Sequence, residues 1–212
     1  MLPILITFLA VAALLFAEQR GSLVGRSVAK PIASTGFLAL ALSSGATQSR
    51  FGDAILVALA LSWLGDVLLI PRSMTWFRLG LGAFLVAHLA YATAFLIRGV
   101  DAHATLAAAA ALFLIGLPIA RGLLPHVQRE MKVPVIAYML LLSIMVALAV
   151  GTTVAEPQPL ITVAAIAFYV SDLSVARDAF VAPSLSNKLW GLPLYYGAQL
   201  LFAALAGAHC AR

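Results

Sequence analysis

The sequence predicts an all-α membrane protein, folded as a single bundle of eight transmembrane helices that forms one domain over residues 1–212. Hydrophobic residues make up 63% of the 212 residues and charged residues only 10%, whereas soluble domains carry about 25% charged residues. Polar segments also divide the chain into eight apolar runs, most of them close to the about 20 residues that span a bilayer as a helix. The single cysteine, Cys210, excludes an internal disulfide framework and a multi-cysteine metal site.

The apolar runs set the expected helices. The first run lacks the basic start and the small-residue cleavage site of a secretory signal, so we interpret it as a retained helix. The fifth run consists almost entirely of small residues and is expected to pack tightly against its neighbours. The segments between runs are rich in Gly, Pro, Ser and charge, as is typical of loops. We expect the helices near residues 2–17, 29–45, 53–70, 76–97, 104–122, 132–151, 159–176 and 188–209.

The basic residues predict the orientation of the bundle. If successive helices alternate in direction, ten of the 13 Lys and Arg residues lie on one side of the membrane and three on the other. Cytoplasmic loops carry the excess of Lys and Arg, so we expect both termini on the non-cytoplasmic side. The scattered basic residues also argue against a nucleic-acid partner. The ten are Arg20, Arg26, Lys30, Arg72, Arg78, Arg121, Arg129, Lys132, Arg177 and Lys188, and the three are Arg50, Arg98 and Arg212.

A faint internal similarity suggests a parallel repeat of two four-helix halves. The dipeptide KP at the expected start of the second helix resembles KVP at the expected start of the sixth. Asp66, late in the third helix, corresponds to Asp172, late in the seventh. An offset of four helices preserves the direction of each helix, as a parallel duplication would.

Most of the eight acidic residues have ordinary explanations. Those in outward loops or at helix starts serve as caps or are hydrated, and those in cytoplasmic loops lie beside basic residues. Asp178 follows Arg177 in an expected loop, where it is either solvated or supports a nearby site. The remaining five of this kind are Glu18, Asp53, Asp101, Glu130 and Glu156.

Asp66 and Asp172 differ because apolar helix continues beyond each of them. A carboxyl group in hydrocarbon costs at least about 2.5–3.5 kcal/mol, so such residues face the bundle interior and commonly mark functional sites. Both are expected about one helical turn, roughly 6 Å, below the cytoplasmic end. The alternative is a pair of structural acids, or acids that reach the membrane interface.

Other polar residues are expected near the two aspartates. Tyrosines can instead belong to an interfacial aromatic belt, and a lone histidine can simply bridge two helices. The spacing of three of these residues in the last helix places them on shared faces, at i, i+3 and i, i+4. The residues are Lys30, His88, Tyr91, Tyr195, Tyr196 and Gln199.

Two carboxyl groups in an apolar pocket favour acid–base chemistry, with one group protonated and the other ionised. Such a pair suits cleavage through an oxocarbenium-like state, as in glycoside hydrolysis, and a vinyl ether can be cleaved in the same way. The same pair could instead relay protons in a transporter or serve a lipid-binding protein. The sequence has no metal-ligand spacing, nucleophile elbow or phosphate loop, so no metal or cofactor is expected.

Five ordered segments resemble the YhhN family of membrane proteins, whose eukaryotic members are lysoplasmalogenases. The segments are KP at 30–31, WLGDVLL at 63–69, GAFLVAHLAYATAF at 82–95, FYVSDLSVARDAF at 168–180 and LPLYYGAQLL at 192–201. The resemblance implies an eight-helix enzyme that hydrolyses the vinyl-ether bond of a lysoplasmalogen with an ethanolamine or choline head group. A hydrolase of another ether or ester lipid remains an alternative.

The polar positions that are typical of the family fall on the two aspartates and on the six polar residues expected near them, which were selected above from their position in the apolar helices. The resemblance adds Ser171, whose hydroxyl is expected to orient Asp172. Asp66 and Asp172 are predicted to be catalytic, with Asp172 as general acid and Asp66 as base, although the reverse assignment stays open. The substrate is expected to enter from the inner leaflet of the cell membrane, with its phosphate near Lys30 or Arg177. The predicted substrate-binding residues are Lys30, His88, Tyr91, Ser171, Tyr195, Tyr196 and Gln199.

Overall fold

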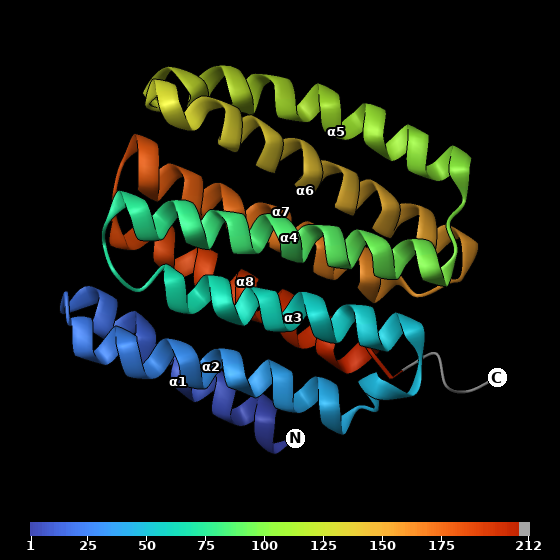
Figure 1. Cartoon of the computed structure of the whole chain (residues 1–212), viewed down its shortest axis with the longest axis horizontal. Helices are drawn as coiled ribbons and strands as arrows, with labels where there is room; N and C mark the ends of the chain where they lie inside the picture. The colour runs from blue at the N-terminus through green and yellow to red at the C-terminus, as the bar shows by residue number, and fades with distance from the viewer. Residues whose placement is uncertain (208–212) are drawn as a thin grey trace.

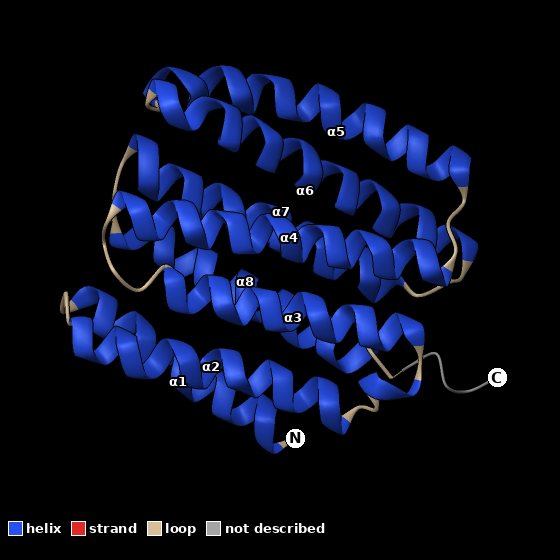
Figure 2. Cartoon of the chain, in the orientation of Figure 1, coloured by secondary structure: helices blue, strands red, loops and turns tan. Residues whose placement is uncertain are grey.

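The computed structural model describes residues 1–207, which form eight α-helices joined by short loops (Figures 1 and 2). Successive helices run in opposite directions, so the start of α1 and the end of α8 lie at the same end of the bundle (Figure 1). Cys210 and Arg212, which entered the sequence-based predictions, lie outside the described residues. The elements are α1 (Leu2–Gln19), α2 (Leu23–Ser43), η1 (Ala46–Gln48), α3 (Arg50–Leu68), α4 (Met74–Arg98), α5 (Ala102–Leu123), η2 (Leu124–His126), α6 (Arg129–Ala155), α7 (Pro159–Ala176), η3 (Arg177–Val181) and α8 (Leu185–Leu205).

The chain is an integral membrane protein. Six of the helical segments in the described part are long and apolar enough to cross a bilayer, whereas α2 and α8 fall short of this criterion. Large apolar side chains cover the outside of the bundle, for example Phe8 and Phe113, as a hydrocarbon environment requires. The side of the membrane that each end faces, and the parallel repeat, stay predictions.

Short polar side chains define several helix starts. Ser22, Ser49, Ser73, Asp101 and Ser184 each accept a hydrogen bond from a backbone amide in the first turn of the following helix. These caps satisfy amide groups that have no partner inside the helix. The expected capping role of Asp101 is therefore confirmed.

The prediction that KP begins the second helix is wrong. Ser22 caps α2, which begins at Leu23 rather than near residue 29, and Pro31 lies inside the helix. Lys30 therefore lies about two turns into α2. The sixth helix likewise begins at Arg129, with Pro134 inside it.

The chain after Ala176 is also more helical than predicted. Residues Arg177–Val181 continue α7 as a π-helical segment rather than a loop. Asp66 lies in the last turn of α3, as expected. Asp172 lies farther from the end of the helical chain than expected, because η3 extends that chain.

The expectation of a tightly packed fifth helix is wrong. α5 lies at one edge of the bundle beside α6 (Figure 1). Leu123 is its buried residue, while Phe113 and Leu114 are more than 60% exposed. The main core cluster instead takes buried side chains from the other seven helices. Small residues on α5 therefore do not bring several backbones together.

Candidate active site

A cavity of about 460 Å³ opens at one end of the bundle, where α1, α3, α5 and α7 end and α2, α4, α6 and α8 begin. All eight helices contribute to its wall, and both Asp66 and Asp172 line it. The volume lies within the range of small-molecule sites in proteins. The cavity lies at the end that the basic residues predict to be cytoplasmic.

Asp66 is surrounded by donors from two other helices. Ser34 Oγ of α2 and Tyr195 OH of α8 donate to its Oδ2 at 2.6 and 2.7 Å. Lys30 Nζ lies 3.2 Å from its Oδ1, and the two side chains of this ion pair are 13% and 3% exposed. An ionised carboxylate only accepts hydrogen bonds, and all three neighbours donate. The arrangement therefore suits an ionised Asp66.

The donors around Asp66 follow from helix spacing. Lys30 and Ser34 lie four residues apart in α2, so they share one face of that helix. Tyr196 OH lies 3.2 Å from Ser34 Oγ and donates toward the Lys30 carbonyl oxygen at 3.5 Å. A chain of hydroxyl groups thus runs from Tyr196 through Ser34 to Asp66.

Asp172 has a different environment. Tyr138 OH of α6 donates to its Oδ2 at 2.6 Å, and His88 Nε2 of α4 lies 3.8 Å from the same oxygen. His88 Nδ1 lies 2.6 Å from the Phe84 carbonyl oxygen. Because a carbonyl oxygen only accepts, Nδ1 carries a proton. The buried Nε2 has no hydrogen-bond partner among the described residues, and its 3.8 Å distance from Asp172 Oδ2 is too long for a direct hydrogen bond.

Aromatic rings enclose the side of the site that holds Asp172. The His88 ring centroid lies 5.1 Å from that of Tyr138 and 4.9 Å from that of Phe168. Phe168 also packs edge-on against Phe84 and at a steep tilt against Tyr195. No ammonium or guanidinium group lies within ion-pair distance of Asp172 among the described residues. The two carboxyl groups therefore face one cavity in unlike surroundings.

Five of the nine predicted site residues line the cavity: Lys30, Asp66, Ser171, Asp172 and Tyr195. The other four, His88, Tyr91, Tyr196 and Gln199, are buried behind its wall. His88 and Tyr196 contact the surroundings of the two aspartates, as described above. Tyr91 OH instead donates to Gln199 Oε1, a short hydrogen bond that joins α4 to α8.

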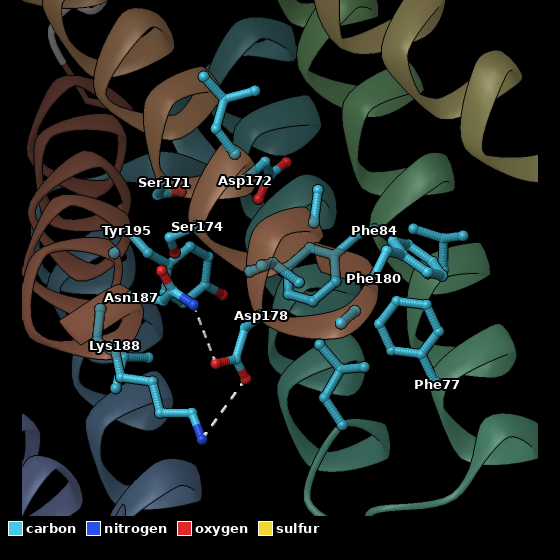
Figure 3. Close-up of a pocket in the computed structure, with 18 of the residues that line it drawn as sticks. Phe77, Phe84, Ser171, Asp172, Ser174, Asp178, Phe180, Asn187, Lys188 and Tyr195 are labelled. Atoms are coloured by element: carbon cyan, nitrogen blue, oxygen red, sulfur yellow. Dashed lines mark hydrogen bonds and ion pairs between the residues drawn. The ribbon is translucent and has the colours of Figure 1, made fainter. Parts of the chain in front are cut away.

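The role predicted for Ser171 is wrong. Its hydroxyl donates to the Phe168 carbonyl oxygen at 2.7 Å rather than to Asp172. Neighbouring residues on a helix project about 100° apart, so Ser171 and Asp172 point in different directions. Figure 3 shows the two side chains on separate parts of the cavity wall.

Sequence reasoning missed three contributors to the site. Ser34 could have been found from its spacing of four residues after Lys30. Tyr138 interrupts the apolar sixth helix, where a hydroxyl group needs a partner. Glu18 lies in the last turn of α1 rather than in a loop, lines the cavity, and forms ion pairs with Arg72 and Lys188.

Asp178 is not merely solvated, which was one of the two roles that the sequence left open for it. Its Oδ1 accepts hydrogen bonds from the Ser184 amide and from Asn187 Nδ2, and its Oδ2 lies 3.6 Å from Lys188 Nζ. Figure 3 shows the contacts of Asp178 with Asn187 and Lys188. Asp178 therefore fixes the start of α8 against η3.

Within residues 1–207, no group of three His, Cys, Asp or Glu side chains is arranged to hold a metal ion. The polar groups around the two aspartates are hydroxyl, ammonium and imidazole groups. Such groups can bind anions and transfer protons.

Comparison with known proteins gives a consistent result. The model of the YhhN family matches residues 25–206. Relatives include proteins named lysoplasmalogenase from Mycobacterium bovis and Mycobacterium tuberculosis, each 30% identical over 193 residues, or 86% of this chain and 72% of the relative. No solved structure matches significantly. The residues that contact Asp66 or Asp172 all lie within the matched range.

Proposed function

The chain belongs to the YhhN family, and we propose that it is a membrane hydrolase that cleaves the vinyl-ether bond of lysoplasmalogens. The products are a fatty aldehyde and a glycerophospho-base. The relatives named lysoplasmalogenase support this reaction class. The observation that carries the proposal is that Asp66 and Asp172 line one cavity in unlike surroundings. Asp66 faces three donors, whereas Asp172 faces a tyrosine and an imidazole nitrogen.

In the first step, protonated Asp172 gives its proton to the vinyl carbon that does not bear oxygen. The electron pair of the carbon–carbon double bond forms the new C–H bond, and an oxocarbenium ion results. Tyr138 donates to Asp172 Oδ2 and so stabilises the carboxylate that forms. His88 Nε2 lies 3.8 Å from the same oxygen.

In the second step, ionised Asp66 removes a proton from a water molecule while the water oxygen bonds to the oxocarbenium carbon. Lys30, Ser34 and Tyr195 hold Asp66 in its ionised form before this step. The resulting hemiacetal collapses when its C–O bond to glycerol breaks. Asp66 returns its proton to the departing glycerol oxygen, and the hemiacetal hydroxyl proton goes to Asp172. One water molecule is consumed, and both aspartates regain their starting states.

The location of the cavity fits a lipid substrate. It lies at one end of a membrane-embedded bundle and joins apolar side chains to charged ones. We propose that a single-chain phospholipid enters from the cytoplasmic leaflet of the cell membrane. Its tail then lies among the helices, and residues 1–212 act as one catalytic domain.

The test measures aldehyde release by purified protein from an alkenyl lysophosphatidylethanolamine, with the saturated 1-O-alkyl analogue as substrate control. We expect aldehyde from the vinyl ether alone. D66N and D172N should each lower kcat by about 10²–10⁴-fold, the usual contribution of a general acid or base. D53N is the matched control, because Asp53 lies exposed in the first turn of α3, the helix that carries Asp66. Turnover retained in both D66N and D172N would contradict the mechanism.

A further inference from the structure

A charged cluster at the mouth of the cavity is not used by the proposed reaction. Glu18 Oε2 lies 2.9 Å from Lys188 Nζ and 3.2 Å from an Arg72 guanidinium nitrogen. Glu18 Oε1 lies 3.9 Å from Arg26 Nε. These four residues come from the end of α1, the start of α2, the loop between α3 and α4, and the first turn of α8. All four line the cavity.

The four side chains differ in how free they are to bind a ligand. Arg26 is 8% exposed and also donates to the backbone oxygens of Ser22 and Ile70, so it anchors the cluster. Arg72 is 59% exposed and reaches Glu18 through one of its nitrogens. A guanidinium group has five donors, so Arg72 keeps donors for a further acceptor. Lys188 is 25% exposed.

The cluster carries excess positive charge. Arg26, Arg72 and Lys188 face two carboxylates, Glu18 and Asp178. Among these five described side chains one positive charge therefore remains uncompensated, at the end of the bundle where we expect the lipid head groups. A phosphodiester is a fitting counter-charge, because arginine binds phosphate oxygens through paired donors.

The far wall of the cavity is apolar. Phe77 and Phe180 pack edge to face at 5.6 Å between ring centroids. Figure 3 shows these rings and Phe84 opposite Lys188 and Asn187. The cavity thus has a charged mouth, a middle that holds the aspartates, and an apolar wall.

We infer that Arg72 and Lys188 form the binding site for the head-group phosphate of the single-chain lipid, with Arg26 and Glu18 fixing their positions. This inference rests on the proposed function for its choice of ligand. The phosphate at the mouth directs the chain attached to glycerol toward Asp66 and Asp172, and the apolar wall receives the rest of that chain. Arg72 and Lys188 determine affinity and orientation and take no part in proton transfer.

The test uses binding rather than turnover. The probe is a radiolabelled, uncleavable 1-O-alkyl lysophosphatidylethanolamine, measured on the full chain in lipid nanodiscs. The comparison ligands are 1-O-alkylglycerol, which lacks the phosphate, and inorganic phosphate alone. R72A and K188A should each raise the Kd of the phospholipid about tenfold, the effect of losing one charge-assisted hydrogen bond. The Kd of the alkylglycerol should not change.

The matched control is R78A. Arg78 is 46% exposed and pairs with Glu130 at 2.7 Å, but it does not line the cavity. Its replacement should leave both Kd values unchanged. If R72A loses thermal stability, R72Q keeps a polar side chain with part of the aliphatic stem, removes the positive charge, and tests the same contribution.

Three results would overturn the inference. The first is wild-type affinity for the phospholipid in both R72A and K188A. The second is an equal loss of affinity for both lipid ligands, which would indicate a structural role. The third is inorganic phosphate competing as well as the phospholipid does, which would indicate a site for a free anion. The proposed function fails separately: a wild-type protein that binds the probe as expected but releases no aldehyde from any vinyl ether would refute the reaction and leave this binding site standing.

Discussion

Replacing Tyr138 by phenylalanine isolates one hydrogen bond on the proposed acid. Tyr138 OH donates to Asp172 Oδ2 at 2.6 Å, and its ring packs against His88. Phenylalanine keeps the ring and removes the hydroxyl group. The bond strengthens as Asp172 loses its proton, because a hydrogen bond to a charged group is worth about 1.5–3 kcal/mol and one between neutral groups about 0.5–1.5 kcal/mol. The difference, about 1–1.5 kcal/mol, corresponds to a five- to tenfold lower kcat.

The measurement is the steady-state rate of aldehyde release against substrate concentration. We expect kcat of Y138F to fall five- to tenfold while KM stays unchanged, because the hydroxyl group acts on the transition state. Y169F is the matched control, since Tyr169 lines the same cavity and makes no hydrogen bond to either aspartate within the described residues. An unchanged kcat, or a rise in KM alone, would refute the assignment of Asp172 as the acid that Tyr138 supports.

Two further variants test the stability of the site. K30M leaves Asp66 buried without its cation and should lower the free energy of unfolding by about 3–5 kcal/mol. A K30M/D66N double variant should recover most of the lost Tm, and a fully stable K30M would contradict this account. G191V places a branched side chain where α7 and α8 touch, since even a Cβ at Gly191 overlaps the Ser174 side chain. Overpacking of this kind costs about 1–3 kcal/mol, so Tm should fall by about 5 °C, and an unchanged Tm would show that the helices separate freely.

The overall architecture was predictable because hydrophobic length and polar loops repeat along the chain. Membrane helices need no partner for their backbone hydrogen bonds, so their positions follow closely from local composition. The predicted helix bounds are wrong where polar side chains interrupt an apolar run. Arg26 and Lys30 made the start of α2 look like a loop. In the fold both side chains are largely enclosed, because Arg26 pairs with Glu18 and bonds the Ile70 carbonyl oxygen, and Lys30 pairs with Asp66. Sequence alone does not reveal such partners.

Which side chains meet was predictable in part. The depth of Asp66 and Asp172 in apolar helices correctly directed attention to one end of the bundle, because an isolated acid in hydrocarbon is costly. The direction of each side chain was not predictable, since it depends on the rotation of each helix about its axis. Ser171 is the clearest case: adjacent in sequence to Asp172, it bonds its own helix backbone. Tyr138 reaches Asp172 from a helix that supplied no motif.

The two helices that fail the hydropathy criterion for spanning a membrane, α2 and α8, are the ones that surround Asp66. α2 supplies Lys30 and Ser34 to the Asp66 carboxyl group, and α8 supplies Tyr195. Helices that supply donors to a buried carboxyl group carry polar side chains on their inner face, and these side chains lower the mean hydropathy of the helix. α5, which contributes two aliphatic side chains to the cavity wall, keeps a high hydropathy and lies at the edge. In this bundle the two helices that fall short of the criterion therefore supply the donors to Asp66, and α5, which supplies none, lies at the edge beside α6.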